Sequence, residues 1–158
     1  MSKSLKRVAA ALEAAGIASE IMEMSDQTRT AQQAADAAGC ALDQIAKSVI
    51  FAGQDSGTAV LFLTAGGNQV DAARASAVAG EPLGKADAAL IRAQTGFAIG
   101  GVAPVGHLSP IRAFMDPRLL DFTVVFAAAG TPRHIFPIAP ARLKEVAGAE
   151  VAAFVVTA

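Results

Sequence analysis

Apolar residues recur at helical spacing through the start of the chain, at positions 5, 8, 9, 12 and 15, and Gly16 follows them as a C-terminal stop. We therefore expect a helix there. Residues 17–24 are rich in large apolar side chains, which predicts a short strand. Thr30 and Gln33 match the spacing of a capping box, so a second helix is expected to begin there and to end at Gly39.

Two apolar runs with β-branched residues, 47–52 and 58–63, flank an Asp-Ser-Gly turn at 55–57. Runs of this kind on either side of a turn predict a β-hairpin. The segments 71–79 and 87–94 each begin with an aspartate that can cap a helix, and each has helical apolar spacing with a glycine just beyond its end. We expect two further helices there.

The second half of the chain alternates short apolar runs with turn residues. Strands are expected at 97–99, 111–115, 122–128, 135–138 and 151–156, and a helix is expected at 141–147. The run 122–128 is the most hydrophobic and is expected at the centre of the sheet. Because hairpins and helices interleave without a linker or a repeat, the pattern predicts one α/β (α+β) domain over residues 1–158, with a mixed sheet.

Composition narrows the classes of function. The 158 residues are 53% hydrophobic and 17% charged, with a formal net charge of −1. Such a chain is neither disordered nor a coiled coil, and it lacks the excess of Lys and Arg that sequence-independent wrapping of nucleic acid requires. Its apolar runs are shorter than the roughly 20 residues of a membrane span. With no export segment recognised either, we expect no membrane association and a cytoplasmic location.

Several common catalytic patterns are missing from the sequence. The glycine pairs lack the flanks of a phosphate-binding or dinucleotide-binding loop, and no Gly-x-Ser-x-Gly is present. His107 and His134 are too far apart to form a helical metal pair. Cys40 is the single cysteine, which excludes a disulfide within the chain, and it fits a structural thiol better than a nucleophile. The sequence predicts neither a metal nor a cofactor.

Three features remain as candidate chemistry. Lys47 opens an otherwise apolar strand and could hold a phosphate or a carbonyl oxygen, although a solvated lysine fits the same pattern. The glycine-rich segment 100–107 could offer backbone N–H groups to a carbonyl or an oxyanion. Residues 130–134 follow the most hydrophobic strand, and sites tend to lie in loops at strand ends. As bare patterns, both segments are equally compatible with ordinary turns.

Taken together and in this order, residues 46–51, the loop 100–107, and Ala-Gly-Thr-Pro at 129–132 with Phe136 resemble the YbaK/EbsC family. This family comprises the free-standing relatives of the editing domain in bacterial prolyl-tRNA synthetases. The resemblance spans nearly the whole chain. It implies the YbaK/prolyl-tRNA synthetase-associated domain fold, a mixed, partly barrel-like β-sheet surrounded by helices.

The family's lysine falls on Lys47 and its Gly-x-x-x-Pro loop falls on residues 100–104, which implies catalytic roles for Lys47, Gly100 and Gly101. The resemblance also implies substrate-binding roles for Ser48, Phe51, Val102, Pro104, Gly106, His107, Gly130, Thr131 and His134. The segment 131–136 departs from the cysteine-specific branch, because Phe136 stands where that branch has a carboxylate. The chain looks closer to branches that clear small residues such as alanine, serine or threonine.

The function implied by the resemblance is that of a trans-editing aminoacyl-tRNA deacylase. The substrate would be the acceptor end of a mischarged tRNA, proline tRNA carrying Ala, Ser, Thr or Cys, and prolyl-tRNA synthetase is a candidate partner. An aminoacyl ester is already activated, so positioning, a bound water and oxyanion stabilisation suffice without a side-chain nucleophile. The alternative is a non-catalytic module that binds aminoacyl-tRNA or a nucleotide.

Overall fold

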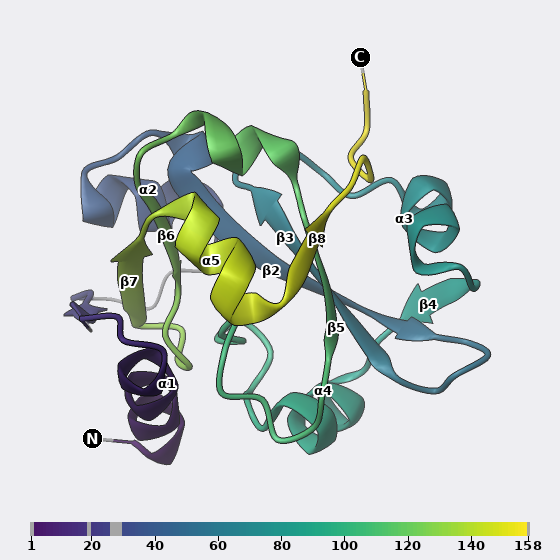
Figure 1. Cartoon of the computed structure of the whole chain (residues 1–158), viewed down its shortest axis with the longest axis horizontal. Coiled ribbons are helices and arrows are strands. Elements are labelled where there is room, and N and C mark those ends of the chain that lie inside the picture. Colours follow the sequence, from purple (N-terminus) through teal and green to yellow (C-terminus); the bar gives the residue numbers. More distant parts are fainter. Residues whose placement is uncertain (1, 19, 26–29, 158) are drawn as a thin grey trace.

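The computed structural model describes residues 2–18, 20–25 and 30–157 (Figure 1). The helices are α1 Lys3–Ala14, α2 Ala31–Ala38, α3 Ala72–Ala79, α4 Ala88–Thr95 and α5 Pro140–Ala147, with 3-10 helices η1 Leu42–Gln44 and η2 Pro117–Asp121. The strands are β1 Met22–Glu23, β2 Ile45–Gly53, β3 Ala59–Ala65, β4 Leu83–Lys85, β5 Arg112–Met115, β6 Val125–Ala128, β7 His134–Ile138 and β8 Ala149–Val151. Among the described residues, no helix has the length and apolar character needed to cross a membrane.

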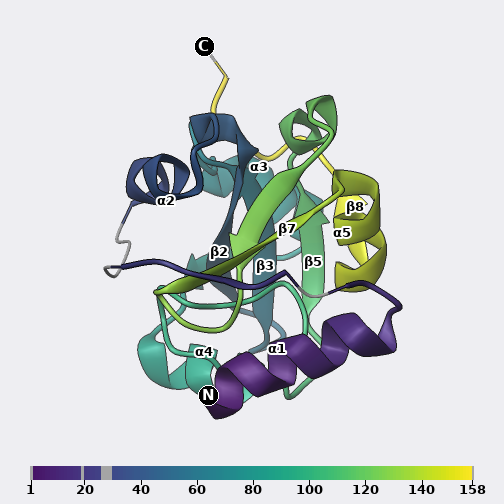
Figure 2. The same cartoon turned by 90° about the vertical axis from the view of Figure 1, so that its left-hand side faces the viewer.

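All the strands belong to one sheet with the order β1-β7-β6-β2-β3-β5-β8, and β4 pairs with β2 outside this path. β2 and β3 form an antiparallel hairpin whose register runs from Ala46↔Ala65 to Ala52↔Ala59. β6 joins β2 in parallel, and β5 joins β3 in parallel. The sheet is therefore mixed, and helices surround it in the two views of Figures 1 and 2. The predicted fold class is confirmed.

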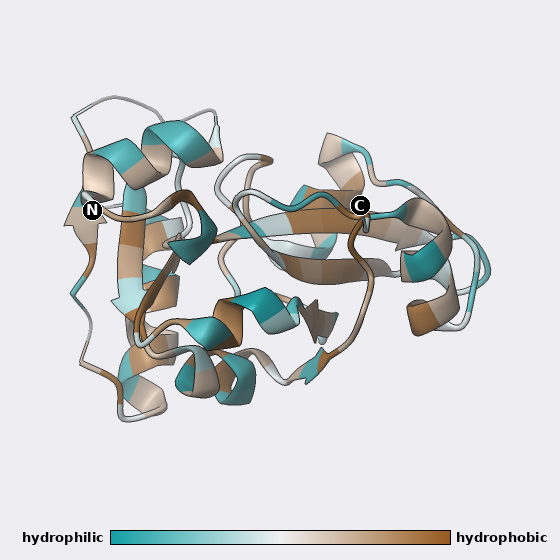
Figure 3. Ribbon diagram, turned by 90° about the horizontal axis from the view of Figure 1, so that it is seen from above, coloured by the Kyte–Doolittle hydropathy of each residue, from teal (hydrophilic) through white to brown (hydrophobic). Residues whose placement is uncertain are grey.

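The core lies on both faces of β3, whose residues are all buried. α1 lays Val8 and Leu12 against the main core, so the apolar stripe seen in the sequence is the packed face of the helix. A smaller cluster holds Phe62 between Phe114 and Phe154, with ring centroids 5.4 and 4.9 Å away. In Figure 3 the central strands are largely hydrophobic, whereas the helices mix hydrophobic and hydrophilic residues.

The helix caps predicted from local sequence are confirmed. The hydroxyl of Thr30 accepts a hydrogen bond from the Gln33 N–H at 3.1 Å, and the Gln33 side chain accepts one from the Thr30 N–H at 3.2 Å. The carboxylates of Asp71 and Asp87 accept N–H groups in the first turns of α3 and α4. These signals succeed because each one depends only on residues a few positions apart.

The strand predicted at 97–99 is wrong. Phe97 is apolar because it is fully buried in the core, and the chain then enters a tight turn in which the Gly101 N–H donates to the Ala98 carbonyl at 3.1 Å. The segment 122–128 yields only β6, an interior strand between β7 and β2, and the middle strand of the order is β2. Phe97 is buried whereas Ile99 is 63% exposed, so the apolar character of residues 97–99 did not specify a strand.

Three other strands also differ from expectation: two have other bounds, and one was not expected. Of residues 17–24, Met22–Glu23 forms β1, and residue 19 lies outside the described residues. The last strand is Ala149–Val151 rather than 151–156, and Val155 makes only an isolated bridge to Val70. β4 was not expected, because Leu-Gly-Lys is too short to show a pattern.

One edge of β2 positions the candidate site. β2 pairs with β6 only through Ile45↔Phe126 and Ala46↔Ala127. On the same edge it pairs with β4 only from Phe51 onward. Between these two pairings, the described part of the chain places no strand beside residues 47–50 on that edge. Residues 47–50 are therefore paired with β3 on one edge only, and their other edge is open where β2 and β6 separate.

Candidate active site

A pocket of about 240 Å³ opens where β2 and β6 separate. β2 contributes four consecutive residues to its wall, and α2, β6, β7 and the glycine-rich loop supply the rest. The lining residues are Thr30, Ala31, Ala34, Ile45, Ala46, Lys47, Ser48, Gly100, Val102, Phe126, Ala127, Ala128 and Ile135. Most of these side chains are apolar and small, and Lys47 and Ser48 are the polar groups supplied by the strand.

Lys47 is half-buried at this pocket, and its Nζ donates a hydrogen bond to the Gly66 carbonyl at 3.3 Å. Burial lowers the pKa of the Lys47 ammonium below its ordinary value, while the negative charges of Asp43 and Asp116 act in the opposite direction. The ammonium is thus held in one place by a neutral acceptor, with two carboxylates near enough to favour its charged form.

Asp116 and Asp43 hold the turn that carries this acceptor. Asp116 is 1% exposed, and its carboxylate accepts from the Ala65 N–H at 3.1 Å and from the Asn68 side-chain amide at 2.9 Å. Asp43 accepts from the Gly67 N–H at 2.8 Å. The sequence analysis singled out neither carboxylate, because neither residue belongs to one of the motifs.

Ser48 differs from the other hydroxyl groups near the pocket. Its Oγ is buried and has no hydrogen-bond partner among the described residues, although it lies in the pocket wall. A buried hydroxyl without a partner costs free energy unless something else satisfies it. A polar group of a bound molecule is one way to supply that partner.

The turn at 98–101 brings the glycine-rich loop to the pocket. Gly100 has a φ of +89° and a Cβ there would meet nothing within 4 Å, so the residue sits at the exposed tip. Gly100 and Val102 line the pocket. Gly101 faces the other way, and a Cβ on it would lie 2.8 Å from the backbone of Thr131. Because the Gly101 N–H already donates to Ala98, only its neighbours can offer an N–H to a ligand.

The segment after β6 supports that loop from behind. Gly130 has a φ of +99°, and a Cβ there would lie 3.0 Å from the Ser4 carbonyl oxygen of α1. The Thr131 hydroxyl and His134 Nδ1 are 2.6 Å apart, and the hydroxyl also accepts from the Arg133 N–H at 3.1 Å. Gly130, Thr131 and His134 therefore form a hydrogen-bonded turn packed behind Gly101, outside the pocket lining.

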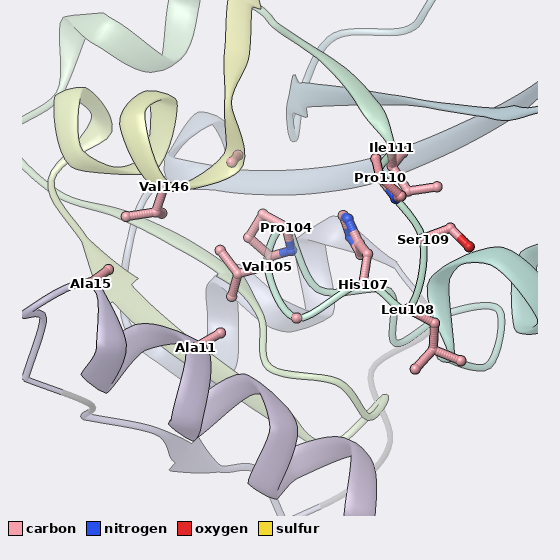
Figure 4. Close-up of a pocket in the computed structure, with 12 residues that line it drawn as sticks. Ala11, Ala15, Pro104, Val105, His107, Leu108, Ser109, Pro110, Ile111 and Val146 are labelled. Carbon is pink, nitrogen blue, oxygen red and sulfur yellow. The ribbon is translucent and has the colours of Figure 1, made fainter.

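The remaining residues of the glycine-rich loop face a second, larger cavity. Pro104, Gly106 and His107 line a space of about 520 Å³ between the loop, α1 and α5. Figure 4 shows Ala11 of α1 and Ala15, just beyond the end of that helix, on one side of this cavity and Val146 of α5 on another. Of the predicted substrate-binding residues, Ser48 and Val102 therefore line the smaller pocket, whereas Pro104, Gly106 and His107 line the larger cavity.

Phe51 lies away from both cavities. Its ring packs edge-on against Phe62, with centroids 5.7 Å apart, in the smaller core cluster. It stands at the end of β2 where β4 pairs, opposite Lys85. The strand places Phe51 four positions beyond Lys47, which is more than 10 Å away by the roughly 3.3 Å rise per residue.

His107 closes its own loop. Its Nε2–H donates to the Ala103 carbonyl at 2.6 Å, and its ring meets the edge of Phe97. Burial lowers the pKa of His107 below its ordinary value; the bond to Ala103 acts against this, and the positive charge of Arg7 adds to it. The neutral imidazole is therefore the form that the fold favours.

A pH-dependent stability follows from this burial. Between the ordinary histidine pKa of about 6.5 and the lower pKa of His107 in the folded chain, the unfolded chain binds more protons, so stability falls as the pH falls, by at most about 1.4 kcal/mol per pH unit. His107→Gln keeps an N–H donor for Ala103 and removes the titration. Urea unfolding at pH 7.5, 6.0 and 5.0 should show a smaller loss of stability on acidification for the variant than for the wild type. Parallel losses would contradict the assignment.

Among the described residues, no cluster of three or more His, Cys, Asp or Glu side chains could hold a metal ion.

Some residues of the pocket wall were not recognisable in the sequence. Ile45 and Phe126 were missed, because an apolar residue in a strand gives no sign of lining a site. Thr30 was noticed only as a helix cap, and the same residue lines the pocket.

Comparison with known proteins identifies the class to which this fold and pocket belong. The model of the aminoacyl-tRNA editing domain matches residues 25–146. The chain therefore belongs to the aminoacyl-tRNA editing domain family, which confirms the resemblance seen in its motifs.

Three individual proteins are similar to this chain over most of its length. A crystal structure of a protein proposed to be a trans-editing enzyme for prolyl-tRNA synthetase is 42% identical, with 99% of each chain covered and a TM-score of 0.92. A hypothetical protein of known structure is 27% identical, with 95% of this chain and 99% of that one covered and a TM-score of 0.86. YwhH, an uncharacterized protein of Bacillus subtilis (strain 168), is 29% identical over 126 residues, 80% of each chain.

Proposed function

We propose that this protein is a trans-editing aminoacyl-tRNA deacylase that hydrolyses the ester of proline tRNA mischarged with a small amino acid such as Ala, Ser, Thr or Cys. The observation that supports this most directly is the small pocket at the separation of β2 and β6. It combines a fixed cation, Lys47, with an unpartnered hydroxyl, Ser48, and a glycine turn at its rim.

The size of the pocket supports a small substrate group. Its volume of about 240 Å³ lies below the roughly 300 Å³ at which cavities for drug-sized ligands begin. Alanines at positions 34, 46 and 127 in its wall leave room for a short side chain and would oppose a bulky one. Sterics alone discriminate a single methylene by only about 1–3 kcal/mol, so neighbouring sizes are expected to overlap in rate.

The chemistry that we propose is attack by water on the ester carbonyl. A bond forms between the water oxygen and the carbonyl carbon, negative charge develops on the carbonyl oxygen, and the bond to the ribose oxygen then breaks. One proton of the water goes to the ribose oxygen, which leaves as a hydroxyl, and the other is released to solvent, so the amino acid leaves as a carboxylate. Lys47 would stabilise the developing charge, together with the N–H of Gly100 or Val102.

Ser48 is proposed to bind substrate rather than to attack it. A serine becomes a nucleophile when a general base accepts its proton within hydrogen-bond distance. The Ser48 Oγ has no partner of any kind among the described residues. The described residues that line the pocket include neither a cysteine nor a histidine. A mechanism by positioning and charge stabilisation is therefore the one that these residues support.

The partner that we propose is the acceptor end of tRNA, encountered in the cytoplasm, with prolyl-tRNA synthetase as the source of the mischarged molecule. Gripping only the last nucleotides requires few cations, since affinity for nucleic acid scales with the phosphates neutralised. A net charge of −1 is compatible with that mode of binding.

Deacylation should be measured on proline tRNA charged with Ala, Ser, Thr, Cys or Pro. We expect release of one or more of the small amino acids, and we expect Ser48→Ala to lower kcat/KM about tenfold, the value of roughly one hydrogen bond to a bound group. Ser109→Ala, in the larger cavity, is the matched control and should leave the rate unchanged. A uniform loss in both variants would contradict the assignment of the smaller pocket.

The alternative function is non-catalytic binding of an aminoacyl-tRNA end or a nucleotide. Saturable binding of charged tRNA without release of amino acid from any member of the panel would favour the binding module. Tight binding of a free nucleotide with no response to tRNA would favour a nucleotide pocket. Either result would overturn the deacylase proposal.

A further inference from the structure

α1 lies outside the residues that the family model matches, yet it contacts both the glycine-rich loop 100–107 and the turn 130–134 behind it. The match covers residues 25–146, and α1 spans Lys3–Ala14. The Ser4 carbonyl of α1 packs against Gly130, and the backbone of Arg7 packs against Gly106. Figure 4 shows α1 running alongside the loop that carries Val105 and His107.

Arg7 makes three contacts with this loop and its stems. Its Nε donates to the Gly106 carbonyl at 2.7 Å, and its Nη2 lies 3.5 Å from the Thr95 carbonyl. Its guanidinium carbon stands 4.4 Å from the centroid of the Phe97 ring. The Arg7 side chain thus contacts residues on both sides of the loop: Thr95 and Phe97 before its tip, and Gly106 after it.

The loop between Phe97 and Gly106 is the one that reaches the pocket, through Gly100 and Val102. Its stems meet through backbone bonds from Leu108 to Thr95 at 3.3 Å and from Ser109 to Gln94 at 3.0 Å. Beyond them, Phe97 anchors one side in the core, and Gly100 stands exposed at the tip. Any shift of Phe97 relative to Gly106 would move the N–H groups of Gly100 and Val102 with respect to Lys47.

The contacts of Arg7 suit an arginine in particular. The guanidinium is planar, so it can stack on the Phe97 ring while its edge donates to a carbonyl beside the ring. Among the described residues, Arg7 forms no ion pair with a carboxylate. Its charge therefore interacts with an aromatic face and neutral backbone oxygens, all of which belong to the loop or its stems.

We propose that Arg7 is a positioning residue of the editing site, holding the loop 97–106 in the conformation that presents Gly100 and Val102 to the substrate. This rests on the proposed function. Contacts that act on the developing oxyanion affect the transition state more than the bound substrate. Removing the Arg7 side chain should therefore lower kcat and kcat/KM together, with little change in KM.

The test compares Arg7→Ala with Arg142→Ala. Arg142 of α5 also donates to a backbone carbonyl of another segment, that of Ala15, at 2.9 Å. Its hydrogen bonds involve neither the glycine-rich loop 100–107 nor the turn 130–134. We expect both variants to lose a similar amount of thermal stability, and only Arg7→Ala to lose about tenfold in kcat on charged tRNA, as a small displacement of catalytic groups would cause. Arg7→Lys, which keeps the charge and one donor, should recover part of that loss.

Hydrogen exchange supplies a readout that does not depend on activity. Amides of residues 98–107 should exchange faster in Arg7→Ala than in Arg142→Ala, and Arg7→Lys provides the same comparison if the alanine variant does not fold. Unchanged kcat and unchanged loop exchange in a folded Arg7 variant would overturn the proposal. A wild-type protein that deacylates nothing would instead overturn the proposed function, and the exchange comparison would still decide the role of Arg7.

Discussion

Replacement of Lys47 by alanine is expected to lower kcat/KM for deacylation by at least about a hundredfold, the effect of removing one donor that stabilises an oxyanion. Lys47 is the cation that β2 supplies to the pocket wall, and its Nζ makes one hydrogen bond, at 3.3 Å to Gly66. Among the described residues that line this pocket, Lys47 is the one that carries a positive charge, so its removal leaves no second cation among them.

The same replacement should leave the fold nearly unchanged. Burial opposes the charged form of Lys47 and lowers its pKa, so loss of the ammonium removes a desolvation cost along with one long hydrogen bond. We expect the free energy of unfolding to change by no more than about 1 kcal/mol. Activity loss would then be separable from unfolding by measuring kcat/KM and urea denaturation on the same preparations.

Two further lysine variants sharpen this test. Lys85 is exposed on β4, opposite Phe51 at the other end of β2, so Lys85→Ala removes an equal charge from the same sheet without touching the pocket. Its activity should match the wild type. Lys47→Arg keeps the charge but changes its shape, and it should recover only part of the rate. Full activity in Lys47→Ala would remove Lys47 from the mechanism.

Replacement of Gly101 by alanine is expected to have the second largest effect, lowering kcat/KM about a hundredfold and destabilising the fold by about 1–3 kcal/mol, the usual range for overpacking. The added Cβ would lie 2.8 Å from the Thr131 backbone. Backbone cannot rotate away as a side chain can, so the turn at 98–101 must move away from the segment 130–134. Gly100 and Val102 would move with it.

Gly80→Ala is the matched control for this prediction. Gly80 caps α3 with a φ of +76°, and a Cβ there would meet nothing within 4 Å. The cost at Gly80 is conformational strain of about 1 kcal/mol, without displacement of any neighbour. Thermal unfolding should therefore respond in both variants, whereas kcat/KM should fall only in Gly101→Ala. An active Gly101→Ala protein would mean that the two segments need not be in contact for catalysis.

Elements whose signals are local were predictable from the sequence. The hairpin of β2 and β3 follows from two apolar runs around a turn, and the caps of α2, α3 and α4 follow from single side chains at fixed offsets. The strand expected at 97–99 failed for a different reason. Phe97 is buried by α1, the main core and Arg7, so its apolar character reflects tertiary contacts rather than strand pairing.

The candidate site was predictable in part. Motif resemblance pointed to Lys47, Ser48, Gly100 and Val102, and these four residues do line one pocket. The same motif also pointed to His107, which faces the other side of the loop. A contiguous motif cannot reveal this division, because successive loop residues point in different directions once the turn at 98–101 is formed.

By itself, the sequence determined the order of most elements and the family, and it singled out Lys47, which is the third residue of β2. Only the tertiary structure decided that a pocket exists, because that pocket depends on β2 and β6 separating after two residue pairs, Ile45↔Phe126 and Ala46↔Ala127. It also decided the support of the loop, where Arg7 meets Gly106 across 99 positions of the chain. Contacts so distant in sequence leave no local pattern, since they arise from packing rather than from the propensities of neighbouring residues.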